Sequence, residues 1–403
     1  MPRVNANILG WARETAGLTR EDAAEKLHLS ESRGVSAVDR LSALEFGEVE
    51  PTRPMLVKMA KVYRRPLLTF YMSTPPRKGN RGQDFRTLPE GHSESDDALL
   101  DALIRNICAR QSMIRAVMEG EEEAITLPFI GSMTISDGVP AVLASIRETL
   151  RIKLSDFRDQ RSHRDAFALL RAGAERAGVF VLLMGNLGSH HTSIDLEIFR
   201  GFALADIFAP FVVINDQDSS AAWSFTLLHE LTHLWLGQTG VSGARTELAI
   251  ERFCNEVAGE FLLPSEELVQ LQFADTTDFN RLVVQISNFA NERNISSSMV
   301  AYRLFLLGSI DQDTWRRCSA YFREHWFQER RRQREREHEK EGAPNYFIVR
   351  RHRVGKALID LVRRMTAAGA LTTSKAGRVL GVKAKHVKRL SDIHGSSSAG
   401  WLV

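Results

Sequence analysis

Apolar residues in the first 75 positions recur every three or four residues in short runs, the spacing that places them on one face of an α-helix. The first helix is expected to end at Gly17. Thr19 is expected to cap a second helix, with Asp22 three residues on in a variant of the capping box. A third helix is expected over residues 36–46, and a fourth after the turn at residues 51–54. The pattern therefore predicts an all-helical N-terminal domain.

Two changes of pattern divide the rest of the chain. Residues 73–97 are rich in Pro, Gly and charge, which is typical of a linker, and the sequence GAPN at 342–345 marks a second boundary. Between them, three short apolar or alternating runs predict a small sheet over residues 179–184, 199–206 and 210–215. Helices are expected over residues 98–120, 140–154, 164–177, 220–236 and 246–263.

The composition fits a folded multidomain protein of a reducing compartment. A chain of 403 residues with 43% hydrophobic content has enough apolar material for two or three buried cores. The three cysteines, Cys108, Cys254 and Cys318, are far apart and odd in number, which argues against a disulfide framework. No run approaches about 18 uninterrupted apolar residues, and the N-terminus lacks the features of a signal peptide. We expect a soluble cytoplasmic protein without a membrane partner.

Charge is nearly balanced over the whole chain but not along it. The formal net charge is only +3, whereas residues 345–390 hold twelve Lys or Arg and a single acid, Asp360. The segment TTSKAGRVLGVKAKHVKRL, residues 372–390, has the helix, short glycine-containing turn and basic helix of a helix-turn-helix-like unit. A solvated basic surface on a dimerising helical domain explains it equally well. Residues 1–75 reach only +2.

The sharpest chemical signal is LLHELTHLW at residues 227–235. On a helix, His229 and His233 lie one turn apart on the same face, so both imidazoles can bind one metal ion. Glu230 is placed to reach a water molecule on that metal without being a ligand. Catalytic zinc usually has a third protein ligand and an open fourth position.

The following helix offers that ligand in IERFCNEVAGEFLLP. Glu251 and Asn255 lie one turn apart there, and GQTGVSG at 237–243 supplies a glycine-rich reversal between the helices. This layout resembles gluzincin-type metallopeptidases. The resemblance implies that His229, His233 and Glu251 bind zinc, that Glu230 is the general base, and that Asn255 holds a ligand histidine. Incidental histidines on a core helix are the structural alternative, but a buried glutamate beside them is costly unless a metal compensates it.

Two other groups near the motif have plainer interpretations. His190 and His191 offer hydrogen-bond donors to an oxyanion, although such a pair is more often part of a polar loop. Cys254 points away from both Glu251 and Asn255 on an ideal helix, so we expect a packed thiol.

The order of these elements resembles the ImmA/IrrE family of zinc metallo-endopeptidases, and the N-terminal segments TREDAAEKL and LSALEFGEVEPT resemble the Xre/Cro type of helix-turn-helix. Together the resemblances cover roughly residues 5–75 and 165–275. They imply an N-terminal helix-turn-helix bundle and a central α+β zincin-like metallopeptidase domain with a small sheet. With the C-terminal basic helical module, which its own pattern indicates, we expect a mainly α, multidomain fold. The expected divisions are 1–75 (helix-turn-helix), 76–97 (linker), 98–164 (helical connector), 165–275 (metallopeptidase), 276–342 (helical extension) and 343–403 (basic module).

The family resemblance also implies a function. Its members cleave a DNA-bound repressor or an antitoxin-like partner and so derepress DNA-damage, mobile-element or anti-phage genes. We therefore expect a DNA-binding transcriptional regulator with zinc-dependent endopeptidase activity, with DNA and a protein substrate as partners and a homodimer as a further possibility. The alternative is a non-enzymatic DNA-binding repressor that uses the metallopeptidase fold as a sensor or dimerisation scaffold.

The N-terminal segment departs from the helix-turn-helix pattern in one respect. The stretch between Leu29 and Glu45 is about seven residues longer than the usual turn plus recognition helix. The candidate DNA-contacting residues at the start of the third helix are Ser36, Ala37 and Arg40. A helical bundle for protein contacts is the alternative interpretation of residues 1–75.

Overall fold

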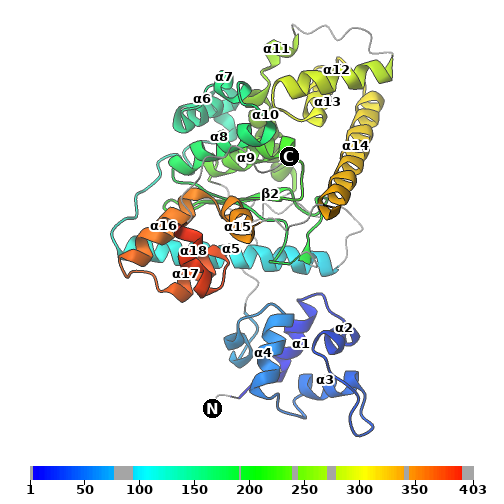
Figure 1. The fold of residues 1–403 in the computed structure, drawn as a ribbon, viewed down its shortest axis with the longest axis vertical. Helices are drawn as coiled ribbons and strands as arrows, with labels where there is room; N and C mark the ends of the chain where they lie inside the picture. Colours follow the sequence, from blue (N-terminus) through cyan, green and yellow to red (C-terminus); the bar gives the residue numbers. More distant parts are fainter. Residues whose placement is uncertain are drawn as a thin grey trace. The chain divides into compact units, whose positions relative to one another are not determined.

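The computed structural model describes residues 3–76, 94–189, 192–237, 244–269, 278–339 and 345–392. Over these residues the protein is mainly helical with one three-stranded sheet, which confirms the predicted fold class (Figure 1). The chain divides into two compact units: Met1–Ile107 with Asn186–Phe199, and Cys108–Gly185 with Arg200–Val403. Among the described helices, none combines the length and apolar character that a transmembrane span requires.

The N-terminal bundle contains α1 (Ala6–Glu14), α2 (Arg20–Lys26), α3 (Ala37–Glu45), α4 (Arg53–Val62) and the 3₁₀ helix η1 (Leu67–Tyr71). Each α-helix begins at a polar N-cap whose side chain accepts a backbone N–H, and Thr19 does so from Asp22 as the capping pattern predicts. The buried core of the bundle includes Ile8, Leu9, Ala12, Ala23, Leu27, Leu41, Met59 and Phe70. Apolar periodicity thus located these helices correctly.

The long connection between α2 and α3 is a small hairpin. Ser32 and Val35 form an antiparallel bridge around Arg33 and Gly34, whose φ angles are both positive at 55° and 75°. Two consecutive positive φ angles are the signature of a tight two-residue turn. The extra residues therefore project as a separate loop before α3, and the Arg40 guanidinium holds it by donating to the Ser30 carbonyl at 2.6 Å.

A buried ion pair fixes the helices of this bundle to one another. Arg13 Nε donates to Glu45 Oε1 at 2.6 Å, and both side chains are almost fully buried. Arg20 Nε donates to the other oxygen of the same carboxylate at 3.1 Å. Since removing one partner of a buried pair leaves an uncompensated charge, Glu45 links α1, α2 and α3 strongly.

The sheet consists of β1 (Phe180–Leu183), β2 (Gly201–Leu204) and β3 (Phe211–Ile214) in the order β1-β3-β2. β3 lies in the middle, parallel to β1 and antiparallel to β2, with Ile214 opposite both Leu183 and Gly201. Every strand residue except Gly201 is buried, which explains the uninterrupted apolar runs in the sequence.

Helices enclose this sheet within the second unit. The helix α9 (Ser220–Trp235) packs against β2 and β3, and also against α8 (His163–Arg176), α10 (Ala244–Leu262) and α6 (Gly138–Leu150). The other helices described before residue 340 are α5 (Glu94–Gly120), whose residues up to Ile107 belong to the first unit, and η2 (Ile135–Asp137), α7 (Leu154–Arg158), α11 (Ser265–Val269), α12 (Phe279–Glu292), α13 (Ser297–Leu306) and α14 (Gln312–Glu339). The helix expected over 140–154 corresponds to α6 but ends earlier, at Leu150, because Arg151 adopts a left-handed conformation (φ 54°). The short α7, which begins at Leu154, was not predicted.

The C-terminal module, residues 345–392, belongs to the same unit. It contains α15 (Tyr346–Val354), α16 (Lys356–Ala367), α17 (Thr373–Leu380), the 3₁₀ helix η4 (Ala384–His386) and α18 (Val387–Asp392). α15 packs on β1 and α16 on α8. Arg171 of α8 donates to the carbonyl of His352, and Glu175 accepts from the Ala357 N–H at 3.1 Å. The module is therefore built onto the helix and strand that support the sheet.

Candidate metal centre

The helix that carries the sequence motif is buried on all sides. Its apolar residues between 227 and 235 are each fully shielded from solvent, because α9 packs against the sheet and against the helices α6, α8 and α10. The polar residues among them share this burial: His229 is 3% exposed, Glu230 5% and His233 1%. Packing from every direction therefore fixes how α9 is rotated, and so where its histidines point.

The segment before α6 closes the C-terminal end of α9. Gly131 and Met133 donate their N–H groups to the carbonyls of Leu234 at 3.0 Å and Trp235 at 3.1 Å. Gly131 also lies against Gly237, where a Cβ would stand 2.7 Å from the Gly131 Cα. These contacts satisfy backbone acceptors that a helix end otherwise leaves unpaired, at the two residues that follow His233.

Two helices bring three donor residues together at one point. His229 Nε2 lies 3.1 Å from His233 Nε2. The two oxygens of Glu251, on α10, lie 3.4 Å from His229 Nε2 and 3.4 Å from His233 Nε2. A tetrahedral zinc ion with ligand distances of about 2.0–2.1 Å holds its donor atoms roughly 3.3–3.4 Å apart. The spacing of these three side chains, all within 4.8 Å of one another, therefore fits a single metal ion.

Asn255 orients one of the two imidazoles. Its Oδ1 lies 3.0 Å from His229 Nδ1, one helical turn beyond Glu251 on α10. Because an amide oxygen only accepts hydrogen bonds, this contact places the imidazole proton on Nδ1. The lone pair of Nε2 then faces His233 and Glu251, as a metal-binding histidine requires.

Glu230 lies over the first residue of β2. A Cβ built on Gly201 would stand 2.8 Å from Glu230 Oε1 and 2.6 Å from the Thr226 methyl group. Only glycine leaves space there for both side chains. Gly201 was not among the residues selected from the sequence, although a glycine inside an alternating apolar run is a known sign of close approach in a strand.

The candidate residues that the sequence analysis names fall into four groups. The structure brings His229, His233, Glu251 and Asn255 into one cluster, with Glu230 beside them on α9. Ser36, Ala37 and Arg40 lie at the start of α3 in the other unit. His190 and His191 lie outside the described residues. Cys254 is fully buried, as expected of a packed thiol.

Comparison with known proteins adds one match. Residues 174–305 match the family model described as the IrrE N-terminal-like domain, a peptidase family. This region contains the sheet, α9, α10 and the histidine–glutamate cluster, and the match supports a metallopeptidase-type domain related to the ImmA/IrrE family. No curated protein and no solved structure matches the chain.

Proposed function

We propose that this protein is a DNA-binding transcriptional regulator with zinc-dependent endopeptidase activity. The observation that carries the proposal is the convergence of His229, His233 and Glu251 at donor distances of 3.1–3.4 Å within a region that matches a peptidase family. Two imidazoles and a carboxylate are a donor set that suits zinc. A zinc ion held there would supply Lewis-acid activation of a water molecule and of the scissile carbonyl.

The roles of the protein side chains follow from their positions. Asn255 keeps the His229 ring in the tautomer that presents Nε2 to the cluster. Glu230 is the general base: its carboxylate takes a proton from the attacking water and later passes it to the leaving amine. Burial on α9 excludes bulk water from that carboxylate, and Gly201 leaves the space it occupies.

The substrate is a protein, and a repressor or antitoxin-like partner is the class that we propose. A transcriptional regulator also needs a DNA-binding element, and the bundle formed by residues 3–76 is the candidate for it. In that bundle α3 begins with an exposed Ser36 as N-cap, followed by Ala37 and Arg40. We propose that this end of α3 meets DNA.

Replacing Glu230 by Gln tests the enzymatic assignment. The variant keeps the shape of the side chain and all three metal donors but cannot accept a proton, so we expect it to retain zinc and to lose cleavage by at least about 10²–10⁴-fold. Zinc is measured by plasma emission spectroscopy. Cleavage is measured by mass spectrometry of new N-terminal peptides in cells that express the wild type or the variant, so the substrate need not be identified beforehand.

The same experiment separates the two candidate classes. New N-termini that depend on Glu230 support a peptidase. Stoichiometric zinc with identical N-termini in wild type and variant contradicts the enzymatic assignment and favours a regulator that uses the fold as a sensor or scaffold.

A further inference from the structure

The C-terminal module contains a second pair of helices joined by a tight turn. α17 ends at Leu380, Gly381 adopts a left-handed conformation (φ 65°), and η4 begins three residues later and continues into α18. Val382 N donates to the Gly377 carbonyl at 2.8 Å, which closes the end of α17. The chain therefore reverses within Gly381–Lys383, the turn length of a helix-turn-helix.

Gly377 allows the two helices to meet at their backbones. A Cβ at this position would stand 2.8 Å from the Val382 carbonyl oxygen and 3.2 Å from the Ala384 nitrogen. Both of those atoms belong to backbone and cannot move aside cheaply. The glycines Gly377 and Gly381 thus lie where the two helices approach each other. Val387 and Leu390 of the second helix pack into the core, with exposed fractions of 4% and 0%.

Neighbouring helices hold this pair in place. α16 packs against both α17 and α18. From α15, Arg350 donates to the Leu380 carbonyl at 2.9 and 3.1 Å, and Arg351 donates to the Leu390 carbonyl at 3.2 Å. Consecutive arginines therefore bind the last carbonyls of both helices, and they are structural rather than available to a ligand.

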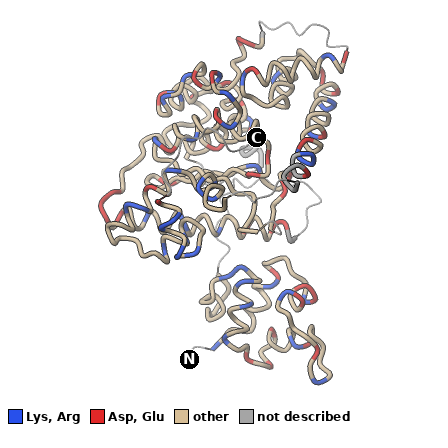
Figure 2. The backbone as a smooth tube through the Cα atoms, in the orientation of Figure 1, with Lys and Arg blue, Asp and Glu red and all other residues tan. Residues whose placement is uncertain are grey.

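The outer face of the pair is basic, and Asp392, at the end of α18, is the one acid within residues 373–392. No Asp or Glu occurs between Asp360 and Asp392. Figure 2 shows Lys and Arg recurring along these short helices. Five basic side chains of the pair are exposed and have no carboxylate partner among the residues that the structure describes: Lys375, Arg378, Lys383, Lys385 and Lys388.

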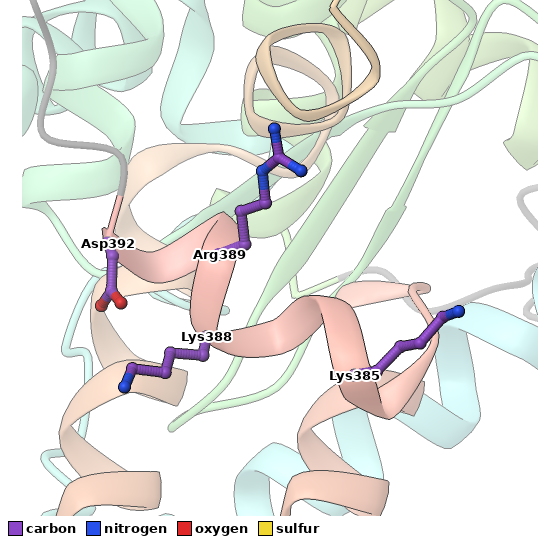
Figure 3. Close-up of a pocket in the computed structure, with 4 residues that line it drawn as sticks. All are labelled: Lys385, Lys388, Arg389 and Asp392. Carbon is purple, nitrogen blue, oxygen red and sulfur yellow. The ribbon is translucent and has the colours of Figure 1, made fainter.

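A hollow of about 420 Å³ lies beside η4 and α18, the second half of the pair. It is lined by Lys385, Lys388, Arg389 and Asp392, which project from η4 and α18 (Figure 3). Arg389 stacks on the Phe347 ring, with the guanidinium carbon 4.4 Å from the ring centroid, so it is partly committed to packing. Lys385 and Lys388 are the two cations of the hollow without such a contact among the described residues.

We infer that residues 373–392 form a DNA-binding helix-turn-helix, with η4 and α18 as the recognition segment in the major groove of duplex DNA. Lys385 and Lys388 would each contact a phosphate at the edge of this groove, and Lys375 and Arg378 would reach phosphates where α17 crosses the backbone. The inference goes beyond the proposed function, which places DNA contact in residues 3–76. It does not depend on metal binding or cleavage.

The test is a titration of the full-length protein with a fluorescent 30-base-pair DNA duplex of mixed sequence, followed by anisotropy at several salt concentrations. The variant is Lys385→Ala with Lys388→Ala. Each phosphate contact that is lost lowers the slope of log affinity against log salt by about 0.9, so the slope should fall by about 2. The same relation predicts that the affinity for DNA falls about eightfold per lost contact near 0.1 M salt, or on the order of 50-fold for the two contacts together.

A matched control removes the same charge elsewhere in the unit. Lys153 and Arg161 are exposed and lie between α6 and α8, and their double alanine variant should keep the wild-type salt slope. Arg40→Ala, in the same titration, reports the N-terminal contact of the proposed function separately. None of the substituted residues belongs to the histidine–glutamate cluster, so the zinc content of every variant should equal that of the wild type.

Each other outcome overturns the inference. A wild-type slope in the Lys385/Lys388 variant, an equal loss in the Lys153/Arg161 control, or no DNA binding by the wild type would each contradict it. Tighter binding to a duplex RNA of the same sequence would contradict the assignment to B-form DNA, because the deep, narrow major groove of A-form RNA does not admit a helix.

Discussion

Two helix pairs carry the proposed chemistry of this protein, and they differ in where they place it. In α9 and α10 the chemical groups point into the interior: both histidines and Glu230 are at most 5% exposed. In α17 and α18 the interior is apolar, and the basic groups point to solvent.

This difference has consequences for how each site works. A buried site depends on a few groups in fixed positions, so the loss of one affects the whole site. An exposed basic face acts through the sum of many screened contacts, so each loss is small and depends on salt. The two sites should therefore differ in how steeply they respond to single substitutions.

The largest effect is expected from His229→Ala. It removes one of three donors, so purified protein should lose stoichiometric zinc after dialysis, as measured by plasma emission spectroscopy. Asn255→Ala should weaken zinc binding by only about 10–100-fold, because it acts through the orientation of His229. His163→Ala is the control, since its Nε2 contacts the Ile295 carbonyl at 3.2 Å, outside the cluster. Full zinc content in His229→Ala would refute this assignment.

Gly201→Ala should have the next largest effect. The added methyl group would overlap Glu230 Oε1 and Thr226, so the carboxylate must shift, and a displacement near 1 Å costs about 10²-fold in rate. Zinc content should stay near that of the wild type, because Gly201 touches none of the three donors. Gly120→Ala is a matched control with no atom within 4 Å of the new methyl group. Undiminished cleavage by Gly201→Ala would show that Glu230 tolerates displacement.

Gly377→Ala should have the smallest effect of the three. Its methyl group would press on the backbone at Val382 and Ala384, at a cost of about 1–3 kcal/mol. Hydrogen exchange at amides between residues 373 and 392 should therefore accelerate, while the amides of α9 stay protected. Equal protection in variant and wild type would mean that the crossing is looser than the structure indicates. A loss of zinc would mean that the two helix pairs are energetically coupled.

Local sequence rules were sufficient to predict the positions of most helices and strands. Polar caps such as Thr19 and Ser36 mark helix starts, and the left-handed glycines Gly17 and Gly47 lie just beyond helix ends. These signals act within a few residues and are independent of the rest of the fold. The end of α6 before Arg151 was not predicted, because a non-glycine residue adopts φ 54° there, which no local preference indicates.

The candidate metal site was only partly accessible from sequence. The spacing of His229 and His233 fixes their common face once a helix is assumed. Glu251 lies on a different helix, and spacing alone cannot say whether α10 folds back onto α9. The role of Gly201 depends on a strand packed against α9, a contact between distant parts of the chain.

The sequence by itself determined the order of the elements, the chemistry of the HELTH motif and the segregation of basic charge into residues 345–390. Only the tertiary structure decided which of those charges are structural, because Arg350 and Arg351 point inward to helix carbonyls while Lys385 and Lys388 point outward. It also decided that three donors separated by up to 22 positions in the chain meet within 4.8 Å. The physical reason is that periodicity and caps are local, whereas burial and close approach are set by which elements pack together.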